Sequence, residues 1–145
     1  MKTYRVVTSF IVKGGKVLIL KRSGRVGSYK GRWSAISGYL ENHPLRQAYT
    51  EISEELSISR ENLKLLVTGD PTEVLDENLR VRWIVHPFLF ELTCEDSEIE
   101  LNWENLEAKW VKPGELKELD TVPDLYRMLK NLWIRVYPHA SLHLE

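Results

Sequence analysis

Four glutamates follow a glycine within one short stretch of the chain: Gly38, Glu41, Glu51, Glu54 and Glu55. If the last three lie on a helix, they share one flank, and Glu51 and Glu55 are one turn apart, where like charges repel by about 0.2–0.5 kcal/mol. A divalent cation bound between them would reverse that repulsion. Because Mg²⁺ and Mn²⁺ prefer hard oxygen ligands and leave positions for water and substrate phosphates, this pattern predicts a hard-metal site.

The helix that must position these glutamates is expected over residues 44–58. Apolar residues recur there at a spacing that puts them on one face of a helix, namely Leu45, Ala48, Tyr49, Ile52 and Leu56. Pro44 is acceptable in the first turn, since the backbone N–H that it lacks has no helical partner there. This apolar stripe predicts the buried face of the helix, with the glutamates beside it.

Strands and a second helix surround this segment. Residues 13–15 (Lys-Gly-Gly) are typical of a tight hairpin turn, and residues 22–30 are polar and glycine-rich, as in a loop that contacts substrate. A second amphipathic helix is expected at 123–136, and strands are expected at 4–12, 16–21, 63–68, 72–75, 80–92 and 107–111. This order favours an α/β fold, with a mixed sheet covered by helices, over an all-β barrel.

The glutamate-rich stretch resembles the box of the Nudix hydrolase family, G-x5-E-x7-R-E-U-x-E-E-x-G-U, in which U is a bulky aliphatic residue. The matching positions are Gly38, Glu51, Ile52, Glu54, Glu55 and Ile58. The resemblance extends over roughly residues 5–120, through stretches at 17–22, 31–38 and 108–116. Within the family, residues 27–33, 36–41 and 85–88 resemble a branch that sometimes occurs beside or fused to domains of the initiation-factor-2B-like superfamily.

Several residues depart from the box. The gap between Gly38 and Thr50 is two residues shorter than the family's gap between its Gly and Arg, so the first Glu of the box would fall at or near Pro44. Thr50 replaces the Arg, and Ser57 replaces the second Gly. In the family the Arg helps to orient the metal-binding glutamates, so its loss bears on catalytic efficiency more than on metal binding. Glu41 matches another acidic position often seen in the box, and with Gly38 it is expected to contact substrate.

The resemblance implies a Nudix-type α/β/α sandwich that hydrolyses a diphosphate linkage in a nucleoside diphosphate derivative or a nucleotide, with Mg²⁺ or Mn²⁺ as cofactor. Glu51, Glu54 and Glu55 would hold the metal. A carboxylate would take the proton of the attacking water, and two options are open for this catalytic residue. One is Glu54 on the helix, and the other is Glu104 in a later loop, with two neighbouring glutamates close behind.

Substrate contacts are implied in the same way. Arg22 would steady the distal phosphate, and Arg32 is a second candidate, because a guanidinium pairs with phosphate oxygens through two parallel hydrogen bonds. Trp33, or an aromatic residue near Trp83, would pack against the leaving group. A tryptophan among β-branched residues is nevertheless more commonly part of the core.

Composition favours one small domain over residues 1–137, followed by a C-terminal tail over 138–145. The net charge of −1 provides no basic field for a nucleic-acid polymer or an anionic membrane, and no apolar stretch is long enough to span a membrane. Cys94 is the only cysteine, which excludes an internal disulfide and favours a reducing, cytoplasmic location. The expected partner is a small-molecule nucleotide or diphosphate, and a homodimer is one option for assembly.

Two alternatives compete with hydrolysis. The first is a catalytically weakened Nudix domain that acts as a nucleotide-binding or regulatory module. The changes at Pro44, Thr50 and Ser57 favour it, because catalytic groups must be held within about 0.5 Å of productive geometry. The second is a diphosphate isomerase of the related isoprenoid type, which needs an active-site cysteine; Cys94 follows a strand and is poorly placed for that role.

Overall fold

The structure is a computed structural model that describes residues 1–138. Its strands are β1 (Lys2–Lys13), β2 (Lys16–Arg22), β3 (Trp33–Ser34), β4 (Ile36–Tyr39), β5 (Leu63–Thr68), β6 (Thr72–Asp76), β7 (Val81–Leu92) and β8 (Asn105–Val111). The helices are α1 (Pro44–Leu56) and α2 (Leu125–Val136), and short 3₁₀ helices lie at Arg60–Asn62, Asp96–Glu98 and Pro113–Glu118. Residues 139–145, which make up most of the expected C-terminal tail, lie outside the described residues.

The sheet is built around β1 and β7, which are its longest strands and pair in parallel over their whole length. All other strand pairs are antiparallel: β1 with β2 and β4, β2 with β3 and β8, and β7 with β5 and β6. The expected hairpin between β1 and β2 is confirmed. Its two-residue turn consists of Gly14 and Gly15, whose φ angles of +59° and +77° are ones that glycine adopts without steric cost.

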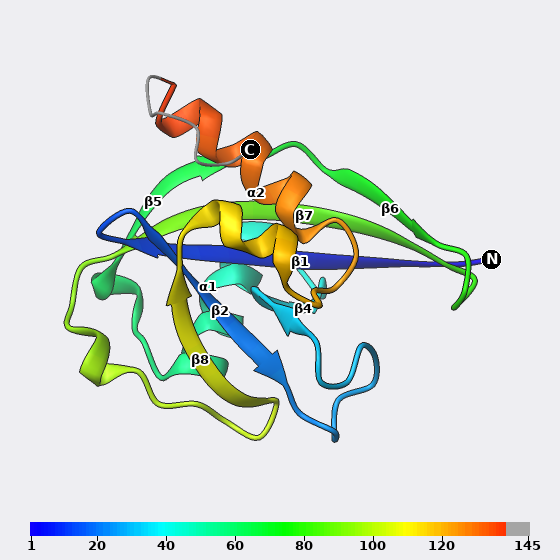
Figure 1. Cartoon of the computed structure of the whole chain (residues 1–145), viewed down its shortest axis with the longest axis horizontal. Coiled ribbons are helices and arrows are strands. Elements are labelled where there is room, and N and C mark those ends of the chain that lie inside the picture. Colours follow the sequence, from blue (N-terminus) through cyan, green and yellow to red (C-terminus); the bar gives the residue numbers. More distant parts are fainter. Residues whose placement is uncertain (139–145) are drawn as a thin grey trace.

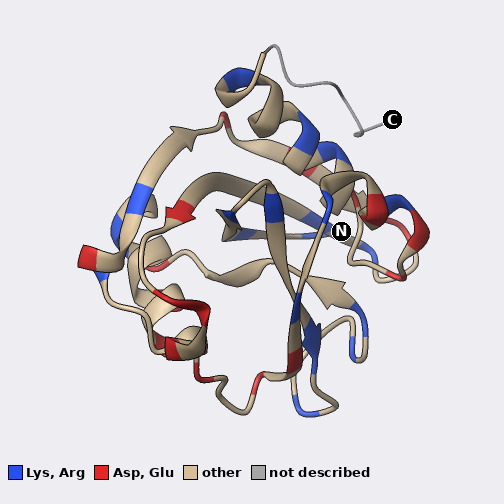
Figure 2. Cartoon of the chain, turned by 60° about the vertical axis from the view of Figure 1, so that its left-hand side comes forward, with Lys and Arg blue, Asp and Glu red and all other residues tan. Residues whose placement is uncertain are grey.

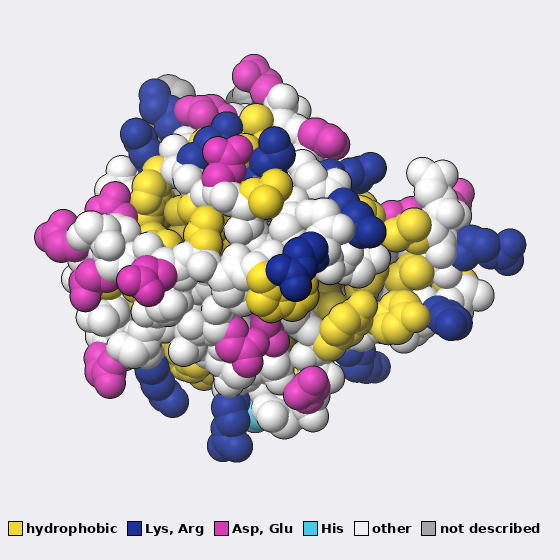
Figure 3. Space-filling view, turned by 90° about the horizontal axis from the view of Figure 1, so that it is seen from below, with side chains coloured by type: hydrophobic (Ala, Val, Ile, Leu, Met, Phe, Trp, Pro, Cys, Tyr) yellow, Lys and Arg dark blue, Asp and Glu magenta, His cyan; other side chains and the backbone are white. Residues whose placement is uncertain are grey.

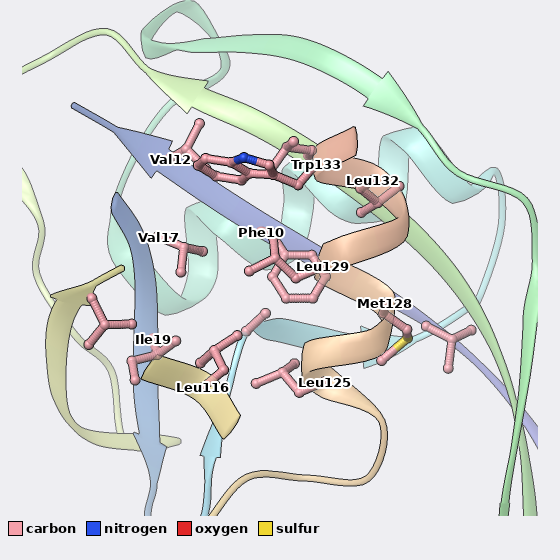
Figure 4. Packing of buried hydrophobic residues seen from close by; sticks show 14 of the residues in the cluster. Phe10, Val12, Val17, Ile19, Leu116, Leu125, Met128, Leu129, Leu132 and Trp133 are labelled. Atoms are coloured by element: carbon pink, nitrogen blue, oxygen red, sulfur yellow. The ribbon is translucent and has the colours of Figure 1, made fainter. Parts of the chain in front are cut away.

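The side chains of the central strands alternate between two faces, because successive residues of a strand point in opposite directions. On β1, Phe10 and Val12 belong to one buried cluster, and Val7 and Ile11 belong to the other. Helix α2 covers the first cluster and α1 covers the second (Figure 1). The α2 residues that point onto the sheet in Figure 4 are Leu125, Met128, Leu129, Leu132 and Trp133. The expected α/β/α sandwich with a mixed sheet is therefore confirmed.

Several details differ from the sequence-based expectation, and the second helix, expected over 123–136, begins at Leu125. The helix expected over 44–58 ends at Leu56, because Ser57 adopts the left-handed conformation with φ of +59°. Strands β3 and β4 were not predicted, since they are too short to show a periodic pattern and depend on pairing with β2 and β1. Lys and Arg are distributed over many elements in Figure 2.

Candidate active site

Helix α1 carries three glutamates beside its buried stripe. Ala48 and Ile52 are fully buried against the sheet, and the neighbouring flank holds Glu51, which is half-buried, and Glu55, which is only 3% exposed. Glu54 is exposed. Because Glu51 and Glu55 are one turn apart, their carboxylates lie on the same side of the helix.

Strand β4 lies directly against Glu51. A Cβ atom added to Gly38 would be 2.1 Å from Cδ of Glu51, which is far inside van der Waals contact. Gly38 does not have a positive φ, so a side chain is excluded there by the lack of space and not by the backbone conformation. The matched glycine of the box thus lets the strand and the carboxylate approach each other.

A third carboxylate joins those of Glu51 and Glu55. One oxygen from each of Glu51, Glu55 and Glu104 lies within 4.8 Å of the others. Glu104 belongs to the loop before β8, and its backbone C=O accepts a 2.8 Å hydrogen bond from the Ser23 N–H. The fold therefore brings together two glutamates expected to bind metal and the loop glutamate that was a candidate base. Glu54 is not in this cluster.

The three carboxylates repel one another in a partly buried site. Burial and repulsion from neighbouring glutamates raise the pKa of Glu51 to about 7. Burial and then the charge of Glu104 raise the pKa of Glu55 well above its ordinary value. Arg22 lies near enough to oppose the rise at Glu55, and burial lowers the pKa of Arg22 itself. Both pKa shifts favour the protonated carboxyl groups, and a bound cation would favour the ionised carboxylates instead.

The residues of the cluster fit a hard divalent cation. All the candidate ligand atoms are carboxylate oxygens, which Mg²⁺ and Mn²⁺ prefer. Oε2 of Glu55 is buried and has no hydrogen-bond partner among the described residues. An unsatisfied buried acceptor costs about 1–3 kcal/mol, so a cation would both satisfy this oxygen and remove the repulsion.

Two amide side chains contact the helix carboxylates, and neither was predicted from the sequence. Nε2 of Gln47 donates a 2.9 Å hydrogen bond to Oε1 of Glu51. Nδ2 of Asn105 donates a 2.9 Å hydrogen bond to Oε1 of Glu55. The spacing of Gln47 one turn before Glu51 could have indicated the first contact, but Asn105 and Glu55 are 50 residues apart in the chain.

A cavity of about 370 Å³ opens beside the carboxylate cluster. Its charged wall includes Arg22, Glu41, Glu51, Glu54 and Glu104. Its aromatic residues are Tyr29, Tyr39, Trp83 and Trp103. Seen from below in Figure 3, acidic, basic and hydrophobic side chains lie next to one another near the centre of the face. The cavity can thus contact both the charged and the planar apolar parts of one ligand.

The aromatic wall is fixed by a chain of hydrogen bonds. Nε1 of Trp83 donates to the Tyr29 hydroxyl at 2.9 Å, and that hydroxyl donates to Oδ2 of Asp76 at 2.6 Å. Burial and the bond to Asp76 raise the pKa of Tyr29 to about 12, so the hydroxyl remains a donor at neutral pH. The rings of Tyr4 and Tyr39 pack against Trp83 at centroid distances of 5.5 and 6.5 Å. Trp83 is therefore held in one orientation.

Of the residues expected to contact substrate, Arg22, Gly38 and Glu41 line the cavity. Arg32 and Trp33 are not among its lining residues. Nε of Arg32 lies 3.7 Å from a carboxylate oxygen of Asp120, at the surface. Trp33 packs against the cluster under α2. Ser34, the next residue in the chain, does line the cavity.

The comparison with protein families agrees with this geometry. The family model described as "NUDIX domain" matches residues 2–132. The chain belongs to the Nudix family. A comparison with curated protein sequences finds no match.

Solved structures of Nudix proteins have the same fold. The Nudix hydrolase from Nitrosomonas europaea has a TM-score of 0.75 at 15% identity, over 93% of this chain and 91% of that chain. A bifunctional NMN adenylyltransferase/ADP-ribose pyrophosphatase from Francisella tularensis has a TM-score of 0.74 at 22% identity, over 90% of this chain and 40% of that chain. The Nudix domain of NrtR from Shewanella oneidensis, in complex with ADP-ribose, has a TM-score of 0.70 at 12% identity, over 93% and 89%.

The departures from the Nudix box have local consequences in this domain. Thr50, at the arginine position, is exposed, and its hydroxyl donates to the backbone C=O of Arg46 at 3.1 Å. Ser57, at the second glycine position, still adopts the left-handed conformation that favours glycine.

Within residues 1–138, no helix has the length and apolar character needed to cross a membrane.

Proposed function

We propose that this Nudix domain hydrolyses a diphosphate linkage in a nucleoside diphosphate derivative or a nucleotide, with Mg²⁺ or Mn²⁺ as cofactor. The observation that carries the proposal is the buried, unpartnered Oε2 of Glu55 within a cluster of three carboxylates. Membership of the Nudix family supports it. So do the names of two proteins with the same fold, an ADP-ribose pyrophosphatase and a Nudix domain bound to ADP-ribose.

In this proposal Glu51, Glu55 and Glu104 hold the metal, because their oxygens lie together. When bound, the cation supplies positive charge that offsets the charge growing on the phosphates and makes water a stronger nucleophile. This assignment differs from the expectation in one respect, since it gives Glu104 the place among the ligands that the family box suggests for Glu54.

Glu54 is then the proposed general base. It lines the cavity, is exposed to water and is not part of the carboxylate cluster. Water attacks one phosphorus of the diphosphate, the bridging P–O bond breaks, and Glu54 takes the proton that the water loses. The products are two phosphate-terminated fragments.

Arg22 and the aromatic wall would bind the two ends of the substrate. Nε of Arg22 donates to the backbone C=O of Ser28 at 2.9 Å, which fixes the guanidinium at the cavity wall. Its two terminal nitrogens remain suited to phosphate oxygens. Trp83 and Tyr39 offer flat apolar surface to a nucleobase or another planar group.

The test is a screen of purified protein with Mg²⁺ over nucleotide sugars, dinucleoside polyphosphates, ADP-ribose and nucleoside triphosphates, with released phosphate and product masses as readouts. We expect cleavage within at least one class, and its loss when a chelator removes the metal. If no compound is cleaved while a nucleotide still binds with micromolar affinity, the domain is a nucleotide-binding or regulatory module and the hydrolase proposal fails.

A further inference from the structure

We propose that Gln47 positions Glu51 for metal binding and so replaces the arginine that the Nudix box has at residue 50. The inference rests on the proposed function, since it concerns a residue that holds a proposed metal ligand. It assigns Gln47 no contact with substrate.

The two hydrogen bonds of Gln47 fix the orientation of its amide group. The backbone N–H of Glu41 can only donate, so it faces Oε1 of Gln47, at 3.3 Å. Nε2 of Gln47 therefore faces the acceptor Oε1 of Glu51, at 2.9 Å. The amide thus links the Glu51 carboxylate to the chain segment that enters α1.

Burial makes this link rigid. Gln47 is only 5% exposed, and a buried amide without partners would be costly. Both of its polar atoms are used at the site, so the side chain keeps one arrangement and holds Glu51 in it. Gly38 also packs closely against the Glu51 side chain. Thr50, in contrast, is exposed, and its hydroxyl donates to a backbone C=O of its own helix.

Asn105 provides a matching contact on the second helix carboxylate. It donates to Oε1 of Glu55, and both residues are buried. Oε2 of Glu55 has no hydrogen-bond partner within residues 1–138 and is free to bind a cation. Glu51 and Glu55 therefore each have one carboxylate oxygen bound by a neutral amide. A neutral donor fixes a carboxylate without adding positive charge, so the cluster keeps its full attraction for a divalent ion.

A double-mutant cycle on Mn²⁺ binding tests the role of Gln47, with affinity measured by electron paramagnetic resonance and by calorimetry. Gln47→Met keeps the length of the side chain and removes both polar atoms. We expect it to weaken Mn²⁺ binding about tenfold, as for the loss of a residue that holds a metal ligand. In a Glu51→Gln background the same change should weaken binding by no more than about twofold, because the carboxylate that it positions is already gone.

Thr50→Val is the matched control on the exposed side of the same helix, and its Mn²⁺ affinity should equal that of the wild type. Circular dichroism and melting curves without metal report whether each variant is folded. If Gln47→Met does not fold, Gln47→Asn carries the same test, since it keeps a polar group but is one carbon too short to span the same gap.

Two results would overturn the inference: a folded Gln47→Met with unchanged Mn²⁺ affinity, or an equal loss of affinity in both backgrounds, which would mean a purely structural role. A wild type that binds no Mn²⁺ would overturn the proposed metal site and the inference together. If Gln47→Met weakens Mn²⁺ binding only when Glu51 is present, but the protein cleaves no substrate, the inference is supported and only the hydrolase proposal fails.

Discussion

The two helices that cover the sheet bury different kinds of side chain. The buried residues of α2 are all apolar: Leu125, Met128, Leu129, Leu132 and Trp133. Those of α1 include three apolar residues, Ala48, Ile52 and Leu56, but also Gln47 and Glu55. The face under α2 is a continuous apolar core, whereas the face under α1 is interrupted at one edge by a carboxylate and the amide groups around it.

The face under α2 mainly contributes to stability, whereas the buried polar groups under α1 serve the proposed chemistry. Apolar burial under α2 stabilises the fold by about 25 cal/mol for each Å² removed from water. Burial of Glu55 has the opposite effect, because it raises the pKa of a group that is ordinarily ionised at neutral pH. Perturbed ionisable groups of this kind gather at functional sites. The comparison predicts that a mutation at the carboxylate site lowers catalysis without loss of stability, whereas a mutation under α2 lowers stability and leaves catalysis unchanged.

Glu55→Gln should have the largest effect on catalysis. We expect metal-dependent hydrolysis to fall at least about 100-fold, or about 2.7 kcal/mol of barrier, because the amide lacks the charge that a hard cation requires. The melting temperature of the metal-free protein should rise at the same time, since the amide does not titrate and removes the cost at neutral pH that the raised pKa of Glu55 reflects. Rate measurements and thermal melts check both effects, with exposed Glu118→Gln as the control. Full activity of Glu55→Gln would remove this residue from the metal site.

Leu129→Ala should affect stability alone. Leu129 is fully buried under α2, so its truncation should lower the free energy of unfolding by about 2–5 kcal/mol. Urea denaturation measures this loss. The rate per folded molecule should stay within about twofold of the wild type. A large drop in the rate of fully folded protein would show that the α2 face contributes to the chemistry.

The metal-free protein should lose stability as the pH rises from about 4.5 to about 7. The folded state binds the Glu51 proton up to a pKa of about 7, against an ordinary value of 4.5, so it holds more protons than the unfolded state in this window. Mg²⁺ should therefore raise the melting temperature more at pH 8 than at pH 5. Melting curves of Glu51→Gln should lack much of this pH dependence, and an unchanged pH dependence would contradict the assignment.

Ser57→Gly should have the smallest effect, a stabilisation of about 0.5–1 kcal/mol. It relieves the left-handed conformation of a residue that carries a Cβ atom. Ser53→Gly, inside the same helix, is the matched control and should destabilise by about 0.5 kcal/mol. Urea denaturation of both variants measures the two effects. Destabilisation by Ser57→Gly would mean that the hydrogen bond from the Ser57 hydroxyl to the Glu100 C=O outweighs the backbone cost.

The sequence predicted the elements whose patterns are local. The apolar stripes of α1 and α2 have helical spacing, and the Gly14-Gly15 turn is decided by two neighbouring residues. Strands β3 and β4 have no such pattern, because pairing with distant strands determines them. The fold could therefore be predicted from periodicity and family resemblance, but not in its shortest strands.

Less of the candidate site could be predicted from the sequence, because its residues come from distant segments of the chain. The three helix glutamates were evident from their spacing, but the partnership of Glu55 with Asn105 crosses 50 residues of chain. Trp33 and Trp83 are both partly buried and pack against the cluster under α2, but only Trp83 lines the cavity. Both residues lie in strands. The sequence does not show which face of the sheet each side chain occupies, because that depends on pairing with distant strands.

The measurement that tests the central claim most directly is the location of Mn²⁺ in crystals of the protein soaked with the ion. Anomalous scattering identifies the ion independently of the protein atoms. We predict one strong peak that is directly coordinated by carboxylate oxygens of Glu51, Glu55 and Glu104, with Oε2 of Glu55 among the ligands. No peak between these residues at saturating Mn²⁺, or a peak at another site only, would contradict the account.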